Sequence, residues 1–255
     1  MIKFGLNLPN GGACADPRTL AEFAAVAEAA GWDGVFLEDY LVYQNQAGTP
    51  TYDPWVCLAA MAMRTSRIKL GTTVTPLPRR RAQKLAAETV ALDHLSSGRV
   101  ILGVGLGDGG DASLDAFGDA LPVAERARVL DEQLEAIVGL WSGEPFSYHG
   151  SHVQIENVTL MPKPVQRPRI PIWVGGRFPN PRAVARAARW DGSCLFKSVS
   201  ADDLTPVDWT PEDLSALRSV VAQWRALDGY DIAIGGRQRA ADWEADRALI
   251  SQLAD

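Results

Sequence analysis

The sequence predicts an α/β fold of the TIM (β/α)8-barrel type in a single domain, residues 1–255, and three observations predict it. Residues 68–107 read as strand, helix and strand with short connections, which is a βαβ unit with parallel strands and a right-handed crossover. The same alternation recurs and gives seven strands, nearly all separated by helices. No low-complexity segment or Gly/Ser-rich linker divides the 255 residues, and alternating βα units over this length favour a barrel over a doubly wound sheet.

The central βαβ unit rests on the spacing of its apolar residues. Ile68–Val74 is an apolar run that is too short for a helix and is followed by prolines, so it is predicted to be a buried strand. The amphipathic segment from about Gln83 to Leu95 is predicted to be a helix with Asp93 on its polar side. A second apolar run, Arg99–Val104, leads into a glycine-rich turn and is predicted to be the next strand.

The residues before this unit predict two further strand and helix pairs. Asp16 is a good N-cap residue and Pro17 suits the first helical position, so a helix begins there and ends at Gly31. The predicted elements are a strand at Ile2–Leu8, a helix at Pro17–Ala30, a strand at Gly34–Leu37, a long polar loop to Thr51 and a helix at Asp53–Arg64.

The second half continues the alternation after one insertion. Pro122–Trp141 is a strongly periodic helix, and the residues after it, Pro145–Leu160, predict a hairpin insertion at about 145–162. The remaining predicted strands are Ile172–Gly175, Ser193–Lys197 and Asp231–Ile234, and the helices are Arg182–Arg189, Pro211–Leu227 and Ala241–Leu253. An eighth βα unit is missing from this pattern, so edge strands and apolar helix faces would be exposed, and we expect a homodimer.

Composition excludes several classes of function. A net charge of −6 argues against nucleic acid or an anionic membrane as the main partner. The chain has neither a run of 18 apolar residues nor a signal-peptide pattern, which predicts a cytoplasmic protein. The three cysteines are widely spaced, and the three histidines form no metal-binding pattern, so we expect reduced thiols and no metal: Cys14, Cys57, Cys194, His94, His149 and His152.

The order and spacing of six segments resemble the bacterial luciferase-like superfamily. The segments are FGLNLP at 4–9, GWDGVFLEDY at 31–40, LGTTVTP at 70–76, LDHLSSGRVILGVGLG at 92–107, ERARVLDEQLEAIVGLWSGEPFSYHG at 125–150 and PKPVQRPRIPIWVGG at 162–176. This superfamily consists of TIM barrels that use FMN or the deazaflavin coenzyme F420. The resemblance implies a flavin-type ring at the C-terminal mouth of the barrel and either hydride transfer or monooxygenation of a small organic substrate. F420 is the preferred cofactor and FMN the alternative.

In a TIM barrel the chemistry lies where the strands run into the following loops, and Asn7 occupies such a position. Thr72, Thr73 and Val74 resemble the segment where the family places a bulge with a non-prolyl cis peptide behind the ring. From the residues alone, an ordinary β-branched strand is the alternative, and Asn7 could simply cap a turn. These four residues are predicted to bind the cofactor.

Two glycine clusters are candidates for the cofactor phosphate. Gly175 and Gly176 are predicted to end a strand, and the helix behind Asn180 would offer free backbone N–H groups, with Arg177 adding charge. A glycine pair required only by tight geometry is the alternative. Gly105 and Gly107 belong to a GxGxG pattern whose following residues, 108–111, favour a flexible loop over a phosphate nest, although both glycines remain cofactor-binding candidates. Arg79, Arg80 and Arg81 are either a solvated charge run or a site for an anion.

Asp39 and Tyr40 are the predicted catalytic residues, which shape the substrate side. In many F420-dependent relatives the second strand ends in Asp-His, and here Tyr40 replaces the histidine, so sugar-phosphate dehydrogenase chemistry of that type is not supported. Tyr40 is a poor base but can donate a hydrogen bond to an oxyanion. Glu38 or Asp39 is a possible base if burial raises its pKa, and a salt-bridged structural carboxylate is the alternative.

The sequence therefore predicts an F420- or FMN-dependent oxidoreductase or monooxygenase acting on a small molecule. Two other classes stay open at this point, because fold alone does not separate them. One is a catalytically silent flavin-binding barrel. The other is a cofactor-free barrel lyase or isomerase on a phosphorylated substrate, in which Lys197 would act as Schiff-base or acid–base group.

Overall fold

A computed structural model describes residues 2–107, 110–200, 203, 205–235 and 243–254 of the chain. Its contacts fall into two compact units, one of residues 3–171 and the other of residues 172–255 together with 1–2. The predicted single domain remains a prediction, and each unit is described by itself. None of the helices in the described part of the chain is long and apolar enough to cross a membrane.

The first unit is built on a parallel sheet. Its strands are β1 (Gly5–Leu8), β2 (Gly34–Leu37), β3 (Lys69–Thr72) and β5 (Val100–Gly105), paired in this order, while the short β4 (Thr75–Pro76) pairs with β5. Leu37 of β2 lies opposite Leu8 on one side and Thr72 on the other, so the three strands end level with one another. The C-terminal ends of neighbouring strands therefore meet at one edge of the sheet.

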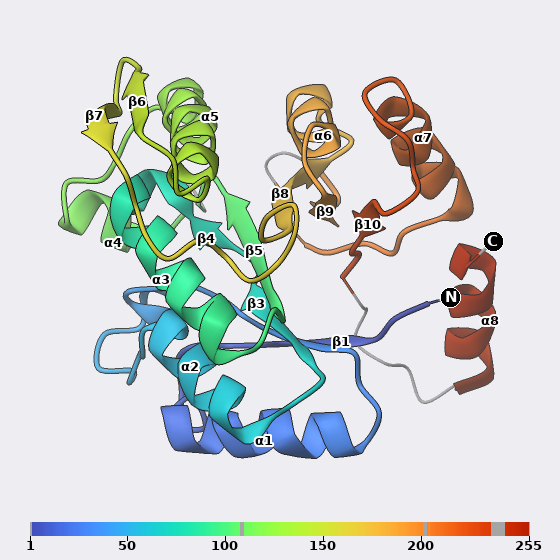
Figure 1. Ribbon diagram of the computed structural model, residues 1–255. Helices are drawn as coiled ribbons and strands as arrows, with labels where there is room; N and C mark the ends of the chain where they lie inside the picture. The colour runs from blue at the N-terminus through green and yellow to red at the C-terminus, as the bar shows by residue number, and fades with distance from the viewer. Residues whose placement is uncertain (1, 108–109, 201–202, 204, 236–242, 255) are drawn as a thin grey trace. The chain divides into compact units, whose positions relative to one another are not determined.

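Helices follow the strands, as the alternation in the sequence predicts. They are α1 (Pro17–Ala29), α2 (Pro54–Arg64), α3 (Ala82–Leu95), α4 (Ala112–Ala116) and α5 (Val123–Leu140), with short 3-10 turns η1 (Tyr43–Asn45) and η2 (Leu77–Arg79). Asp16 and Asp53 cap α1 and α2 by accepting hydrogen bonds from two backbone N–H groups each. The helices α1, α2, α3 and α5 pack successively against one another (Figure 1).

The two faces of this sheet carry different side chains because strand residues alternate. On one face the Phe36 ring lies over three glycines, since a Cβ atom at Gly5, Gly34 or Gly71 would come within 3.2 Å of that ring. Val35 and Leu37 point to the other face, toward the helices, and both are fully buried. The glycine face is thus opposite the face that carries Val35 and Leu37.

The hairpin insertion is confirmed and is fixed to α5. Strands β6 (Phe146–His149) and β7 (Gln154–Val158) pair antiparallel. Beside their turn, Glu132 of α5 accepts hydrogen bonds from the backbone N–H groups of Ser151, His152 and Val153 at 2.7–3.1 Å. The His152 ring bridges Glu132 and Glu125.

The second unit contains three parallel strands and three helices. The strands β8 (Ile172–Phe178), β9 (Gly192–Lys197) and β10 (Asp231–Ile232) are paired in this order. The helices are α6 (Pro181–Ala188), α7 (Pro211–Val221) and α8 (Trp243–Ala254). Among the described residues of both units, the parallel strands β1, β2, β3, β5, β8, β9 and β10 follow the predicted order, the short β4 is additional, and an eighth βα unit is not present.

One helix was not predicted, and two predictions of detail were wrong. Residues 112–116 form the short helix α4, which Asp111 caps. Asp93 is fully buried rather than on a polar face, because it accepts hydrogen bonds from Val165 N, Gln166 N and Gln166 Nε2. The predicted helix Pro211–Leu227 ends at Val221.

Candidate active site

The ends of β1, β2 and β3 bring Asn7, Glu38 and Thr73 to the same edge of the first sheet. The parallel ladder continues past the strand ends, since Glu38 N donates to Leu8 O at 3.1 Å and Thr73 N donates to Leu37 O at 2.9 Å. Alternation then places Asn7, Glu38 and Thr73 on the glycine face, in line with Phe36. We call these three residues and Gly105 the mouth.

A hydrogen bond across β2 shows that the mouth is concave. The Thr73 hydroxyl donates to Asn7 Oδ1 at 2.6 Å, although β1 and β3 are not neighbours in the sheet. Two strand spacings separate such strands by roughly 9–10 Å in a flat sheet. Two short side chains bridge that separation because the sheet curls toward the glycine face. Asn7 is exposed and Thr73 half-buried, so both remain accessible to a ligand.

The segment Thr72–Val74 has the backbone that the family resemblance implies. The peptide bond between Thr73 and Val74 is cis. Thr72 does not offer its hydroxyl to a ligand, because it is fully buried and donates to Gly103 O at 2.8 Å. Val74 is half-buried, and a Cβ atom at Gly105 would lie 2.6 Å from Val74 Cγ2. Gly105 is therefore needed for the close approach of β5 to the bulge.

Asp39 is held by two arginines on the face opposite the mouth. Its side chain is fully buried, and it binds Arg79 at 3.0 Å and Arg80 at 2.8 Å. Arg79 also binds Asp111, and Arg80 also binds Asp53. This geometry favours the salt-bridged alternative for Asp39 over proton transfer. It also engages Arg79 and Arg80 with carboxylates, which argues against their use for an anion.

Glu38 differs from Asp39 in its hydrogen-bond partners. Its Oε2 atom is buried, and within the described part of the chain it has no hydrogen-bond partner. Burial raises the pKa of Glu38 above its ordinary value of 4.5. The Glu38 charge in turn contributes, after burial, to raising the pKa of Tyr43 in the following loop. A carboxyl group at a strand end that has a buried oxygen without a partner is a candidate for acid–base chemistry.

Tyr40 is positioned through its backbone. The buried Asn10 side chain accepts from Tyr40 N at 3.1 Å and donates to Tyr40 O at 2.8 Å. The Tyr40 ring contacts the Tyr43 ring edge to face at 5.5 Å. Sequence analysis missed Asn10, because its partner lies 30 residues further along the chain.

The loop after β5 is tied to the same edge. Asp111 accepts from Ser113 N and Arg79, and Asn45 bonds both Gly110 O and Ala112 N. Gly107 has a φ of +81°, a conformation that favours glycine, and its carbonyl accepts from Arg126 Nη1 at 3.2 Å. Of the predicted flexible loop 108–111, residues 108 and 109 lie outside the described residues.

The predicted phosphate site in the second unit differs from expectation. Gly175 and Gly176 do not end their strand, because β8 continues to Phe178 and both glycines pair with β9. The first N–H groups of α6 are not free, since Asn180 Oδ1 accepts from Arg182 N and Ala183 N. A Cβ atom at Gly176 would meet Ala183 Cβ at 2.9 Å, which agrees with the tight-geometry alternative. Arg177 is half-buried.

Lys197 is engaged in the second unit as well. Its Nζ forms an ion pair with Asp213 and donates to Asp208 O. An amine held in this way is not poised for a Schiff base, so the lyase alternative is not favoured.

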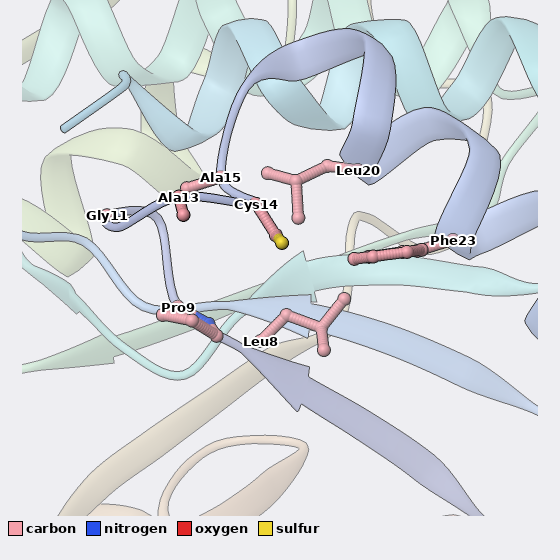
Figure 2. A pocket seen from close by; sticks show the side chains of 8 residues that line it. All are labelled: Leu8, Pro9, Gly11, Ala13, Cys14, Ala15, Leu20 and Phe23. Carbon is pink, nitrogen blue, oxygen red and sulfur yellow. The ribbon is translucent and has the colours of Figure 1, made fainter. Parts of the chain in front are cut away.

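A cavity of about 260 Å³ lies between the end of β1 and the start of α1 (Figure 2). Its lining is mostly apolar and includes Leu8, Cys14, Leu20 and Phe23, with the Cys14 side chain pointing inward. Leu8 alternates with Asn7 along β1, so this cavity lies on the helix side of the sheet and is separate from the mouth.

Comparison with known proteins adds to this geometry. The family model described as luciferase-like monooxygenase matches residues 2–198. An uncharacterized protein of Mycobacterium tuberculosis is 34% identical over 221 residues, which are 80% of this chain and 76% of that protein. An F420-dependent glucose-6-phosphate dehydrogenase of Microbacterium testaceum is 34% identical over 205 residues, 79% of this chain and 57% of that protein.

A solved structure shows the fold. The coenzyme F420 dependent tetrahydromethanopterin reductase from Methanopyrus kandleri matches with a TM-score of 0.72 and 24% identity, over 91% of this chain and 65% of that one. The predicted TIM-barrel-type α/β fold is confirmed by this likeness. The chain spans only about two thirds of the length of that protein, and a smaller share of the dehydrogenase.

Proposed function

The chain belongs to the luciferase-like monooxygenase family, and from this premise we propose that it is an F420-dependent oxidoreductase that transfers a hydride to or from a small organic substrate. FMN, with either hydride transfer or monooxygenation, is the alternative. The relative named as an F420-dependent dehydrogenase supports the preference for F420.

The single observation that carries this proposal is the concave mouth of the first unit. It combines the accessible pair Asn7 and Thr73, the bulge at Val74 backed by Gly105, and the buried Glu38 Oε2 atom, which has no partner among the described residues. A flat ring needs a close-approaching backbone beneath it and a few polar groups at its edge, and these residues provide both. The residues present thus fit a deazaflavin or flavin ring.

Each residue then has a defined part in the proposal. The bound cofactor supplies the hydride chemistry. Thr73 and Asn7 would bind its polar edge, while Val74 and Gly105 support its face. Asp39 holds Arg79 and Arg80 and so keeps the loops in place, and Tyr40 lines the substrate side. Thr72 fixes the bulge from behind, and Gly107 keeps the loop after β5 in its turn.

Gly175, Gly176 and Arg177 of the second unit stay proposed phosphate ligands. The prediction relied on free backbone N–H groups at the start of α6, and the Asn180 side chain already accepts hydrogen bonds from two of them. The phosphate role is therefore tested separately from the mouth. Arg177→Gln is expected to weaken binding of F420, and unchanged binding would overturn the assignment of Arg177 to the phosphate.

The experiment is a fluorescence titration of the purified full chain with F420 and, separately, with FMN. Micromolar or tighter binding of F420 alone is expected. Binding of FMN alone would transfer the proposal to the alternative cofactor, and the absence of binding of either would overturn it. Glu156→Gln on the hairpin serves as the matched control, because Glu156 lies away from the mouth on an exposed strand.

A further inference from the structure

Glu38 differs in its ion pairing from three other carboxylates at this end of the sheet. Asp39, Asp53 and Asp111 each bind an arginine in a connected set of ion pairs. The Glu38 carboxyl belongs to no such pair, and its Oε2 is buried and unpartnered among the residues that the structure describes.

The position of Glu38 also differs. It follows β2 on the glycine face, in line with Phe36 and between Asn7 and Thr73, whereas Asp39 points to the arginines on the other face. The titratable neighbour whose pKa responds to Glu38 is Tyr43, from the loop after β2. A protonated carboxyl has one O–H donor, and no described protein group is bonded to Glu38 Oε2.

We propose that Glu38 is the catalytic acid of the mouth, which gives its proton to the substrate that accepts a hydride. The inference rests on the proposed function. Hydride addition to a carbonyl or enone would form one C–H bond on the substrate, at the cost of a C–H bond of the reduced cofactor that the proposed function supplies. It would leave the electron pair of the double bond on oxygen, directly or as an enolate. The O–H bond of Glu38 breaks, its proton neutralises that anion, and the electron pair of the broken bond stays on the carboxylate. The carboxylate then takes up one proton from bulk solvent, which is the proton that the reduction consumes. The reverse reaction uses the carboxylate as base.

Burial makes this role chemically reasonable. A general acid works best when its pKa lies closer to the working pH than that of a free carboxyl group, and desolvation shifts the pKa of Glu38 in that direction. A glutamate on an exposed surface would have lost its proton at neutral pH and would have none to give.

The test uses infrared spectroscopy of the cofactor-free full chain, with Glu38→Gln and Glu156→Gln as variants. The wild type and Glu156→Gln are expected to show a protonated-carboxyl C=O band that persists above the ordinary glutamate pKa of 4.5. Glu38→Gln lacks this band, and Glu38→Asp restores one. A Glu38 band that titrates at the ordinary value would overturn the inference.

A second readout asks whether this acid lies in the mouth. Addition of F420 is expected to shift the Glu38 band, and binding without any shift would contradict the inference while leaving the proposed function intact. Failure of F420 and FMN to bind would instead remove the proposed function, and the band of the cofactor-free chain would still report the state of Glu38.

Steady-state kinetics distinguish a catalytic acid from a glutamate that is only buried. With reduced F420 and cyclohexenone as the acceptor probe, Glu38→Gln is expected to lower kcat by roughly 10²–10⁴-fold with little change in KM. Equal kcat values for Glu38→Gln and the wild type would overturn the role, and Glu38→Asp is expected to recover part of the rate.

Discussion

The Thr73 hydroxyl and Asn7 Oδ1 lie 2.6 Å apart and join the ends of two strands that are separated by a third. The bond places both side chains on the concave face of the first unit, next to the bulge. Asn7 is exposed and Thr73 is half-buried, so a ligand can reach both side chains. We therefore expect this bond to affect ligand binding more than the free energy of unfolding.

Thr73→Val removes the donor of this bond and keeps the shape of the side chain. We expect weaker binding of F420, by roughly 3- to 10-fold, because one net hydrogen bond contributes about 0.5–1.5 kcal/mol. The free energy of unfolding should change little. Fluorescence titration checks the first expectation and urea denaturation the second. Thr205→Val, on an exposed loop, is the control, and equal affinity of Thr73→Val and wild type would contradict the proposed contact.

Asp39→Asn tests whether this carboxylate is structural. The variant leaves Arg79 and Arg80 without their shared counter-charge, and the Arg79 side chain is 3% exposed. Removing one partner of a buried ion pair typically costs about 3–5 kcal/mol. We expect a loss of that order in urea denaturation, whereas Asp203→Asn on an exposed loop should behave as wild type. Unchanged stability with lost activity would instead favour the catalytic role predicted from the sequence.

Glu28 makes stability depend on pH in the acid range. Burial acts to raise the pKa of Glu28, but hydrogen bonds from the backbone N–H groups of Ile68, Arg67 and Ser66 outweigh it and lower this pKa from 4.5 to about 2. A depressed pKa in the folded state gives stability that is complete above about 4.5 and lost as the pH falls toward 2. The difference in unfolding free energy between wild type and Glu28→Gln should therefore shrink between pH 5 and pH 3, and a constant difference would argue against the ionised contact.

His152 has the opposite pH dependence. Hydrogen bonds to Glu132 and Glu125 raise the pKa of His152 above its ordinary value of 6.5. Its contribution to stability is therefore complete below 6.5 and is lost as the pH rises through the raised pKa. In thermal unfolding, the Tm advantage of wild type over His152→Gln should be largest near pH 6 and smaller near pH 9. His149→Gln on the same hairpin is the control, and a difference that grows with pH would refute this assignment.

Local signals in the sequence predicted the elements of the fold well. Asp16 and Asp53 were recognisable as caps because a cap acts on residues two and three positions away. The predicted strand Gly34–Leu37 has the same bounds as β2. Asn10, Asp93 and Arg126 were not predicted to be important, because their partners lie 19 to 73 residues away in the chain and a single sequence does not pair them.

Only part of the site could be predicted, because its other contacts also join residues that are far apart in the sequence. The bulge at Thr73 and Val74 came from the resemblance to a family, and the cis peptide lies there. Glu38 and Asp39 are adjacent carboxylates, and the sequence does not show which of them contacts Arg79 and Arg80. In the folded chain, Asp39 makes these contacts. The sequence prediction treated the first N–H groups of α6 as free to bind phosphate. In the structure, the Asn180 side chain accepts hydrogen bonds from two of them.

The arginine that joins Asp39 to Asp111 also limits how this scaffold can be re-engineered. Arg79 links the segment after β2 to the cap of α4, and α4 belongs to the loop after β5. A graft that exchanges the β5 loop with that of a relative would remove one of the two carboxylates of Arg79. Variation in this loop is therefore coupled to Arg79, and a transplanted loop is expected to succeed when it brings its own acidic cap to the same position.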